Sequence, residues 1–341
     1  MTGLIGCDVP LAERYDLALV DLDGVAYRGH DPIANAAEGL GGARARGMSL
    51  VFVTNNASRE PESVAAQLTE LGIPAGPDEV MTAAQAAAGV LSTRLRPGAK
   101  VLVVGGAGLL TAVRNAGFTV VTSADDEPEA VAQGFAPEVG WTQLAEAAYA
   151  VQRGAWHVAS NLDLSLPMAR GIAPGNGSLV GAVRAATGVV PDSAGKPSPT
   201  MYRLAVERAG ASAPMVIGDR LDTDLGGARA AGYPGLHVLT GINSGRDAVL
   251  AHPSERPYFV GADLLSVLEA HPAPEATAEG WWTTRGAAAR VVDGRLELRP
   301  AAGDTTELNL LRSACAAAWA AADDGAPVDA ASVPELAVPG T

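Results

Sequence analysis

Two aspartates separated by one residue are the first feature of this chain that can do chemistry. Asp21 and Asp23 follow the apolar run 17–20 and precede Gly24. The period of two along a strand sends both carboxylates to the same side of the strand axis, at its carboxyl end. Two like charges this close are costly unless a cation or an exchangeable proton relieves them. Because open α/β sheets bind ligands beyond the carboxyl ends of their strands, the pair predicts a site for Mg²⁺ and a phosphate ester.

Three further polar motifs follow in order, each at the end of an expected strand or at the start of a helix. They are Thr54-Asn55-Asn56, Gly195-Lys196-Pro197 and Gly218-Asp219-Arg220-Leu221-Asp222-Thr223-Asp224. Each motif alone has a structural explanation as a turn, a helix N-cap or a surface lysine. Four motifs in order along one sheet edge favour a common chemical site over four unrelated turns.

The elements that must hold these residues alternate between short buried strands and Ala-rich helices. Strands are expected at 17–23, 48–54, 100–106, 155–160, 215–219 and 235–240, and helices at 62–71, 79–92 and 198–210. With 48% hydrophobic but only 4% aromatic residues, the core must be built from Ala, Val and Leu, which suits helices packed on parallel strands. The sequence therefore predicts an α/β fold with a doubly wound parallel sheet.

Changes in composition divide the chain into a discontinuous core, an insert and a tail. A Rossmann-like core domain is expected over 1–82 and 188–265, with an α/β cap domain over 83–187 inserted between its halves. Residues 272–341 are expected to form a small α+β C-terminal extension that docks on the main body, because so short a segment has a limited core of its own. Its last dozen residues are expected to be disordered.

The net charge and the cysteines limit the partners and the compartment. A formal charge of −14 argues against nucleic acid or an anionic membrane as a partner. No run of about 18 apolar residues is present to span a bilayer, and the N-terminus lacks a basic segment followed by an apolar one. Cys7 and Cys315 provide neither a disulfide framework nor a zinc spacing. The expected location is the reducing cytoplasm.

The motifs resemble those of the haloacid dehalogenase (HAD) superfamily of phosphotransferases over residues 14–265. The phrases that carry the resemblance are Asp21-Leu-Asp-Gly-Val, Phe52-Val-Thr-Asn-Asn, Ala159-Ser-Asn-Leu-Asp with Pro167, Gly195-Lys-Pro-Ser and Gly218-Asp-Arg-Leu-Asp-Thr-Asp. The chain is most similar to the branch with 4-nitrophenylphosphatase-like, phosphoglycolate and pyridoxal-phosphate phosphatases. Within that branch its composition and its tail most resemble actinobacterial glycerol 3-phosphate phosphatases with a C-terminal extension.

The resemblance implies a role for each core motif. Asp21 is the nucleophile that forms an aspartyl-phosphate, and Asp23 protonates the leaving alkoxide and then activates water. Lys196 neutralises the nucleophile and the phosphate. Mg²⁺ is bound by Asp21, the backbone carbonyl of Asp23 and Asp219, while Asp224 orients waters in the outer shell.

The resemblance also implies residues that bind phosphate and substrate. Thr54, Asn55 and Asn56 are expected to bind phosphate oxygens, aided by the N-terminus of the adjacent helix. Asn161 and Asp163 match the cap motif of the branch and are expected to position the substrate. A plain turn capped by these two side chains is the alternative.

Two features bear on the type of reaction. Dehalogenases of the superfamily lack the second carboxylate, since a halide needs no proton to leave, so Asp23 favours an oxygen leaving group. Asp23 and Thr54 are 31 positions apart, whereas Thr54 and Lys196 are 142 apart. The cap must therefore lie in the second gap. Phosphomutases that share the first motif carry their cap in the first gap, and a mutase is disfavoured.

The sequence thus predicts a Mg²⁺-dependent phosphomonoesterase that acts on a small organic phosphate, with glycerol 3-phosphate as the first candidate. Phosphoglycolate, pyridoxal phosphate and a nucleotide are the alternatives within the same chemistry. Gly134-Phe135 is followed by Ala136 where the family often has an acidic residue, so the resemblance does not fix the substrate. A regulatory or binding protein without turnover on the same fold is a second class. The sequence also leaves open whether two copies of the chain form a homodimer through the cap.

Overall fold

The computed structural model describes residues 3–168, 170–301 and 306–338, which fall into two compact units. The first unit consists of residues 1–51, 71–73 and 209–341, and the second of residues 52–70 and 74–208. The boundary runs through the strand β4 (Ser49–Thr54), whose first three residues belong to the first unit. The predicted division into core, cap and extension stays a prediction.

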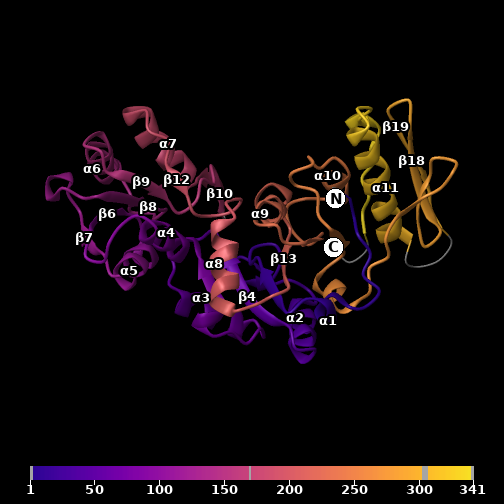
Figure 1. Cartoon of the computed structure of the whole chain (residues 1–341), viewed down its shortest axis with the longest axis horizontal. Helices are drawn as coiled ribbons and strands as arrows, with labels where there is room; N and C mark the ends of the chain where they lie inside the picture. The colour runs from indigo at the N-terminus through magenta and orange to yellow at the C-terminus, as the bar shows by residue number, and fades with distance from the viewer. Residues whose placement is uncertain (1–2, 169, 302–305, 339–341) are drawn as a thin grey trace. The chain divides into compact units, whose positions relative to one another are not determined.

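The first unit is built on a sheet of parallel strands (Figure 1). Four of these strands are buried along their whole length. Its sheet has the order β15-β14-β13-β1, and the start of β4 continues it. The strands are β1 (Leu17–Val20), β13 (Pro214–Gly218), β14 (Gly235–Val238) and β15 (Phe259–Gly261). A continuous apolar run is typical of a parallel strand that is covered on both faces.

The other elements around this sheet are short. The helices are α1 (Leu11–Arg14), α2 (Ala36–Ala45), the π-helical turn η3 (Leu221–Leu225), α9 (Gly226–Ala231), α10 (Gly245–Val249) and η4 (Leu264–Leu268). The strands β2 (Tyr27–Arg28) and β3 (Asp31–Pro32) form an antiparallel hairpin just after Gly24. The turn η3 and the hairpin therefore follow β13 and β1, two of the strands whose ends carry predicted site residues.

The end of the first unit is an antiparallel sheet with one long helix. The sheet contains β16 (Glu275–Ala276), β17 (Trp282–Thr284), β18 (Ala287–Val292) and β19 (Arg295–Arg299), followed by α11 (Thr306–Asp323) and η5 (Ala330–Ser332). Helix α11 packs against β17 and β18 (Figure 1). Its Leu311, Cys315 and Trp319 belong to one buried cluster with Leu225 and Val249. The predicted docking of the extension is thereby confirmed.

The end of the described chain packs on this cluster. Val333 and Val338 are 4% and 8% exposed and belong to the same hydrophobic cluster as α11. The predicted disorder of the last dozen residues stays a prediction. Residues 339–341 lie outside the described part of the chain.

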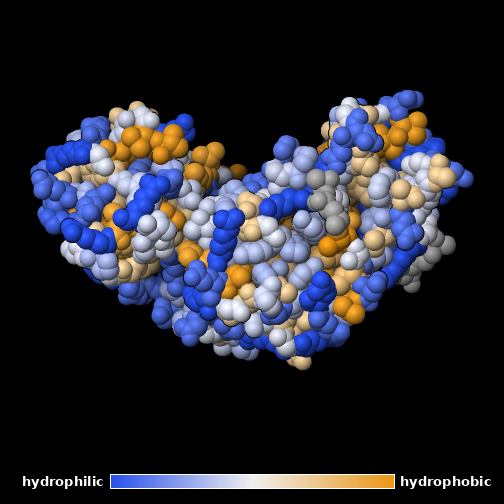
Figure 2. All heavy atoms as spheres, viewed as in Figure 1, coloured by the Kyte–Doolittle hydropathy of each residue, from blue (hydrophilic) through white to orange (hydrophobic). Residues whose placement is uncertain are grey.

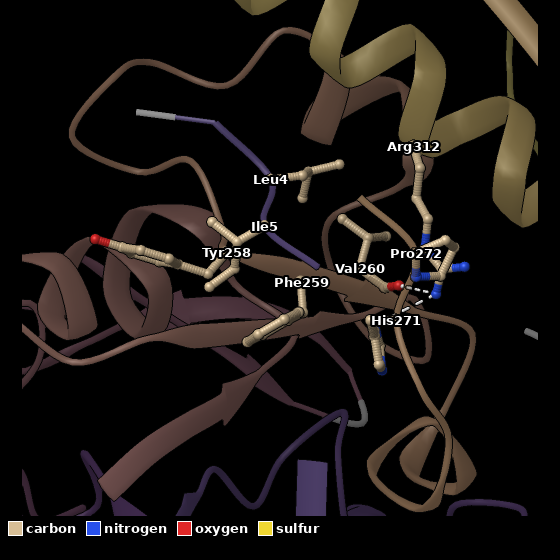
Figure 3. A pocket seen from close by; sticks show the side chains of 8 residues that line it. All are labelled: Leu4, Ile5, Tyr258, Phe259, Val260, His271, Pro272 and Arg312. Carbon is tan, nitrogen blue, oxygen red and sulfur yellow. Dashed lines mark hydrogen bonds between the residues drawn. The ribbon is translucent and has the colours of Figure 1, made fainter. Parts of the chain in front are cut away.

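A buried histidine lies where the N-terminal segment, β15 and α11 meet (Figure 3). The Nε2 atom of His271 is 2.8 Å from the carbonyl oxygen of Ser266, and its Nδ1 atom is 3.4 Å from a guanidinium nitrogen of Arg312. Arg312 also donates to the carbonyl oxygen of Val260 over 2.9 Å. The indentation here is about 150 Å³ and has no room for a water molecule. It is therefore a gap between packed side chains and not a ligand site.

We expect His271 to make the protein less stable in mild acid. Burial lowers the pKa of His271 to about 4, and the Arg312 charge contributes in the same direction. This is below the unfolded value of about 6.5, so the unfolded chain binds the proton first as pH falls. Stability is then constant above about pH 6.5 and is lost towards pH 4. Between pH 7 and pH 5, the wild type should lose about 2 kcal/mol more of its free energy of unfolding than His271→Gln loses.

Urea unfolding at each pH measures this difference. A His271→Gln variant with the full wild-type loss between pH 7 and pH 5 would contradict the assignment.

The second unit contains a parallel sheet of its own. Its order is β12-β9-β8-β6-β7. The strands are β6 (Lys100–Val104), β7 (Thr119–Val121), β8 (Ala130–Gln133), β9 (Trp156–Ala159) and β12 (Asp192–Ser193). The helices are α3 (Pro61–Glu70), η1 (Pro77–Glu79), α4 (Ala83–Ser92), α5 (Ala107–Asn115), η2 (Ala124–Asp126), α6 (Trp141–Gln152), α7 (Asn176–Thr187) and α8 (Thr200–Ala209). The strands β10 (Ser165–Met168) and β11 (Gly171–Pro174) form a hairpin.

The predicted helix 79–92 begins four residues later than expected. Residues Val80–Thr82 form the strand β5, which pairs with the end of β4. The helix α4 then begins at Ala83, because Thr82 and Gln85 form a capping box. The Gln85 N–H donates to Thr82 Oγ1, and the Thr82 N–H donates to Gln85 Oε1 over 2.9 Å.

The glycine-rich segment 105–108 is explained by close packing. It follows β6 but lacks the third glycine of a dinucleotide-binding fingerprint. The Gly108 N–H donates to the Ser58 carbonyl oxygen over 3.1 Å. A Cβ at Gly108 would lie 2.5 Å from the carbonyl oxygen of Arg59 and 2.8 Å from that of Ala57. Only a glycine allows the start of α5 to approach this backbone so closely.

Apolar side chains are also exposed in the second unit. Figure 2 shows hydrophobic residues gathered on the surface over α7. Near the β10–β11 hairpin, Leu164 is 72% exposed and Ile172 is 82% exposed. The homodimer through the cap stays a prediction. No helix in the described part of the chain is long and apolar enough to cross a membrane.

Candidate active site

Three carboxylates of the first unit converge at the carboxyl ends of β1 and β13. One carboxylate oxygen from each of Asp21, Asp219 and Asp224 lies within 4.8 Å of the others. Asp219 and Asp224 are fully buried, and Asp21 is 9% exposed. Like charges this close cost free energy that a bound cation offsets. A donor set made only of oxygens suits a hard divalent cation such as Mg²⁺.

The parallel register of the sheet brings Asp21 and Asp219 together. Val20 is the partner of Ile217, and the Asp21 N–H donates to the Ile217 carbonyl oxygen over 2.9 Å. Asp21 therefore leaves β1 beside the end of β13, and Asp219 is the first residue after β13. The sequence predicted this meeting of two strand ends.

The π-helical turn η3 returns the Asp224 carboxylate to the cluster. Asp224 accepts a hydrogen bond from the Arg220 N–H over 3.1 Å. Gly218 makes room for it, because a Cβ at that position would overlap the Cβ and the carboxylate of Asp224. The sequence predicts Asp224 to act in the outer shell. The structure places it in one group with the other two carboxylates. That it acts through outer-shell waters, rather than as a direct ligand, stays a prediction.

The loop of residues 240–244, which follows β14, encloses Asp219. The Ile242 N–H donates to Asp219 Oδ2 over 2.7 Å. The missing side chain of Gly241 leaves space for the Asp219 carboxylate, with which a Cβ would overlap. Sequence reasoning missed this loop. Its only local signal is a Thr-Gly pair at the end of an expected strand.

The same loop fixes the turn that carries Asp21 and Asp23. The hydroxyl of Thr240 donates to the Gly24 carbonyl oxygen over 2.6 Å, and the Arg28 guanidinium donates to the Thr240 carbonyl oxygen over 2.8 Å. Gly24 has a φ of +85°, which glycine adopts without strain. The aspartate turn is thus attached to the loop beyond β14.

Asp23 lies outside the carboxylate cluster. β1 ends at Val20 rather than at residue 23, because the Gly24 N–H donates to the Tyr27 carbonyl oxygen and closes a turn. The strand period therefore does not extend to Asp23, whose side chain is exposed while Asp21 is nearly buried. The acid–base role of Asp23 and its carbonyl contribution to a metal site stay predictions.

A neutral histidine lies beside this site. His237 on β14 is in register with Gly218 and is fully buried. Burial lowers the pKa of His237 to about 4, although the charge of Asp224 opposes the shift. His237 is therefore uncharged at neutral pH and does not relieve the repulsion among the three carboxylates.

In the second unit, the side chain of Asn55 joins Lys196 to Asp163. Asn55 Oδ1 accepts the Lys196 N–H over 2.8 Å, and Asn55 Nδ2 donates to the Lys196 carbonyl oxygen and to the Asp163 carboxylate. Asn161 Nδ2 donates to the Asn55 carbonyl oxygen over 2.7 Å, while its Oδ1 accepts the Asp163 N–H. Four predicted residues therefore form one network, in which Asn161 both caps a turn and holds Asn55.

Lys196 and Asn176 complete this network. The Lys196 side chain is 4% exposed, and its Nζ is 3.4 Å from the carbonyl oxygen of Val53. Asn176, at the start of α7, is buried and donates to the Asn161 carbonyl oxygen over 2.7 Å. Sequence reasoning missed Asn176, because no motif marks it. The lysine ammonium is therefore held close to the end of β4.

Thr54 and Asn56 differ in their surroundings. Thr54 is 6% exposed, and its hydroxyl accepts the Asn56 N–H over 3.1 Å. Asn56 is exposed, and its Oδ1 accepts hydrogen bonds from the N–H and the hydroxyl of Ser58. The helix α3 begins only at Pro61. These residues therefore do not cap a helix. The start of α3 lies one residue before the predicted start at 62, and the part of this helix N-terminus in phosphate binding stays a prediction.

A parallel α/β sheet with converging carboxylates beyond its strand ends defines a divalent-cation site of the kind used for phosphoryl transfer. The family model for haloacid dehalogenase-like hydrolases matches residues 18–119, and a second HAD-hydrolase-like model matches residues 193–267. The D-glycerol 3-phosphate phosphatase of Mycobacterium tuberculosis is 44% identical over 312 residues, which cover 91% of this chain and 88% of that protein. The chain belongs to the haloacid dehalogenase-like hydrolase family.

Solved structures agree with this assignment. A crystal structure of the M. tuberculosis glycerol phosphate phosphatase in complex with magnesium has a TM-score of 0.83 at 42% identity and covers 92% of each chain. The p-nitrophenyl phosphatase from Archaeoglobus fulgidus has a TM-score of 0.70 at 29% identity and covers 74% of this chain and 98% of that one. The predicted fold class and the resemblance to phosphatases of this branch are confirmed.

Proposed function

We propose that this protein is a Mg²⁺-dependent phosphomonoesterase that hydrolyses a small organic phosphate through an aspartyl-phosphate. The observation that carries the proposal is the group of Asp21, Asp219 and Asp224 at the ends of parallel strands, in a chain of the haloacid dehalogenase-like family. Asp21 is 9% exposed while the other two carboxylates are fully buried, so it is the one of the three that a substrate can reach.

The reaction has two steps on the chain's own residues. In the first, an oxygen of Asp21 attacks phosphorus, the bond to the alkoxide oxygen breaks, and Asp23 gives that oxygen a proton. In the second, water attacks phosphorus while the Asp23 carboxylate takes its proton, and the bond to Asp21 breaks to release phosphate. The exposed position of Asp23 supports exchange of its proton with substrate and water.

The remaining residues bind and shield charge. Mg²⁺ bound by Asp21, Asp219 and the Asp23 carbonyl, with Asp224 orienting waters in the outer shell, would neutralise charge that develops on the phosphoryl oxygens. Lys196, Thr54 and Asn55, with Asn56 and the cap residues Asn161 and Asp163, are assigned to phosphate and substrate binding by the family motifs. The bonds from Asn55 to both backbone groups of Lys196 support a role of Asn55 in positioning the lysine.

Glycerol 3-phosphate is the substrate that we propose. Its support is the activity for which the M. tuberculosis relative is named, since that protein matches this chain over nearly its whole length. Phosphoglycolate, pyridoxal phosphate and a nucleotide are the alternatives within the same chemistry. A cytoplasmic location is proposed with it, supported by Cys7 and Cys315, which are both buried free thiols.

Phosphate release with Mg²⁺ across these four phosphomonoesters tests the function and the substrate. We expect kcat/KM for glycerol 3-phosphate to exceed the others by at least about tenfold, the discrimination that a few pocket contacts supply. Similar kcat/KM values for all four would contradict glycerol 3-phosphate as the specific substrate, while the phosphatase reaction would stand. No release from any of them would favour the binding or regulatory protein.

A further inference from the structure

The 240–244 loop holds the metal-site aspartate through more than one bond. Besides the bond from Ile242 to the Asp219 carboxylate, the Asn243 N–H donates to the Asp219 carbonyl oxygen over 3.3 Å. Asn243 Oδ1 accepts the Leu221 N–H over 2.9 Å, at the start of η3. This loop therefore fixes the backbone on both sides of Arg220, between the aspartates of the cluster.

The position of the loop depends on the helix α10 that follows it. Ser244 is the N-cap of α10, and its hydroxyl and N–H bond to the Asp247 carboxylate in a capping box. The helix has only five residues. A helix this short is not stable in isolation and takes its position from tertiary contacts.

Those contacts come from the C-terminal extension, residues 272–338. The half-buried Arg246 donates to the carbonyl oxygens of Val333 over 3.0 Å and of Ala330 over 2.7 Å. Trp319 Nε1 donates to the Ala248 carbonyl oxygen over 3.1 Å, where both residues are buried. Three points of the extension thus bind one short helix.

The fit at the start of α10 is equally close. A Cβ at Gly245 would lie 2.6 Å from the carbonyl oxygen of Leu336 and 3.2 Å from the Leu311 side chain. α10 therefore cannot move toward the extension, while the bonds of Arg246 and Trp319 keep it from moving away. The extension defines the helix position from both directions.

We propose that the C-terminal extension is a clamp on α10 that positions the 240–244 loop and so sets the affinity of the Asp219 site for Mg²⁺. Arg246 and Trp319 act as positioning residues that touch neither substrate nor metal. The inference rests on the proposed Mg²⁺ site.

Mg²⁺ titration by isothermal calorimetry, without substrate, tests the clamp in the full chain. Arg246→Gln removes the guanidinium donors to Ala330 and Val333. We expect the dissociation constant for Mg²⁺ to rise by about tenfold, the lower end of the effect of residues that orient metal ligands. The Mg²⁺ concentration for half-maximal phosphate release should rise equally, with a smaller change in kcat at saturating Mg²⁺.

Ser313→Ala is the matched control. Ser313 lies buried on α11, and its hydroxyl donates to Thr284 Oγ1 and the Ala287 carbonyl oxygen, away from α10. We expect it to lower the unfolding midpoint in urea and to leave the Mg²⁺ dissociation constant unchanged. If both variants weaken Mg²⁺ equally, general destabilisation explains the effect and the clamp is wrong.

Asp219→Asn separates failure of the clamp from failure of the proposed function. If the wild type binds Mg²⁺, Asp219→Asn does not and Arg246→Gln binds like the wild type, only the clamp is overturned. If Asp219→Asn binds Mg²⁺ like the wild type, the metal site itself is overturned and the clamp falls with it.

Discussion

Asp21→Asn should abolish phosphate release from every substrate. The amide has the shape of the carboxylate but no charge, and its oxygen is a far weaker nucleophile. It also removes one of the three converging carboxylates at the site. We expect kcat to fall by at least about a thousandfold, as when the nucleophile of a hydrolase is removed. The measurement is phosphate release at saturating Mg²⁺, with no stable phosphoenzyme trapped by acid quench.

Asp23→Asn should instead give a loss that depends on the leaving group. Glycerol leaves as a strongly basic alkoxide and needs a proton, whereas 4-nitrophenolate leaves without one. We expect a loss of about 10²–10⁴-fold with glycerol 3-phosphate. With 4-nitrophenyl phosphate the first step should persist and the second should be slow, because water has lost its base. A burst of nitrophenolate, equal in amount to the enzyme, is the expected signature.

The two variants are matched, since each replaces one carboxylate of the same turn with its amide. Asp21 is nearly buried in the carboxylate cluster and Asp23 is exposed outside it. A burst from Asp21→Asn, or equal losses with both substrates in Asp23→Asn, would show that the roles of nucleophile and acid are wrongly assigned.

The carboxylate cluster is the part of the site that sequence can predict. Asp21 and Asp219 each come directly after a run of buried apolar residues. Parallel strands end at the same edge of a sheet, so the strand pattern alone places together two residues that are 198 positions apart in the chain. Asp224 is within reach for the same reason, since it lies on the turn that follows Asp219.

Other parts depend on contacts that leave no local pattern. The end of β1 at Val20 is set by a turn closed on Tyr27, so the strand period ends before Asp23 and carries no information about its neighbours. Asn176 holds Asn161 through one hydrogen bond and carries no motif. The role of Gly241 is evident only when Asp219 lies beside it. Such residues are specified by tertiary packing, where local propensity carries little information.

Gly241→Ala should weaken Mg²⁺ binding without changing a single charge. A Cβ at this position would overlap the carboxylate of Asp219 and lie 2.5 Å from its Cβ. The Cβ of Asp219 is fixed by the end of β13, so a rotation of the side chain cannot relieve the clash. Either the carboxylate leaves the cluster or the 240–244 loop is displaced. We expect the Mg²⁺ dissociation constant to rise by about 10- to 100-fold or more.

Gly41→Ala is the matched control for this substitution. Gly41 lies in α2, and a Cβ there would meet no atom within 4 Å. It should bind Mg²⁺ like the wild type and gain up to about 1 kcal/mol of stability from the better helix propensity of alanine. Calorimetric Mg²⁺ titration and circular dichroism distinguish the outcomes. A folded Gly241→Ala protein with wild-type Mg²⁺ affinity would mean that Asp219 does not hold the cation, because no ligand so close to the new methyl group could keep its place.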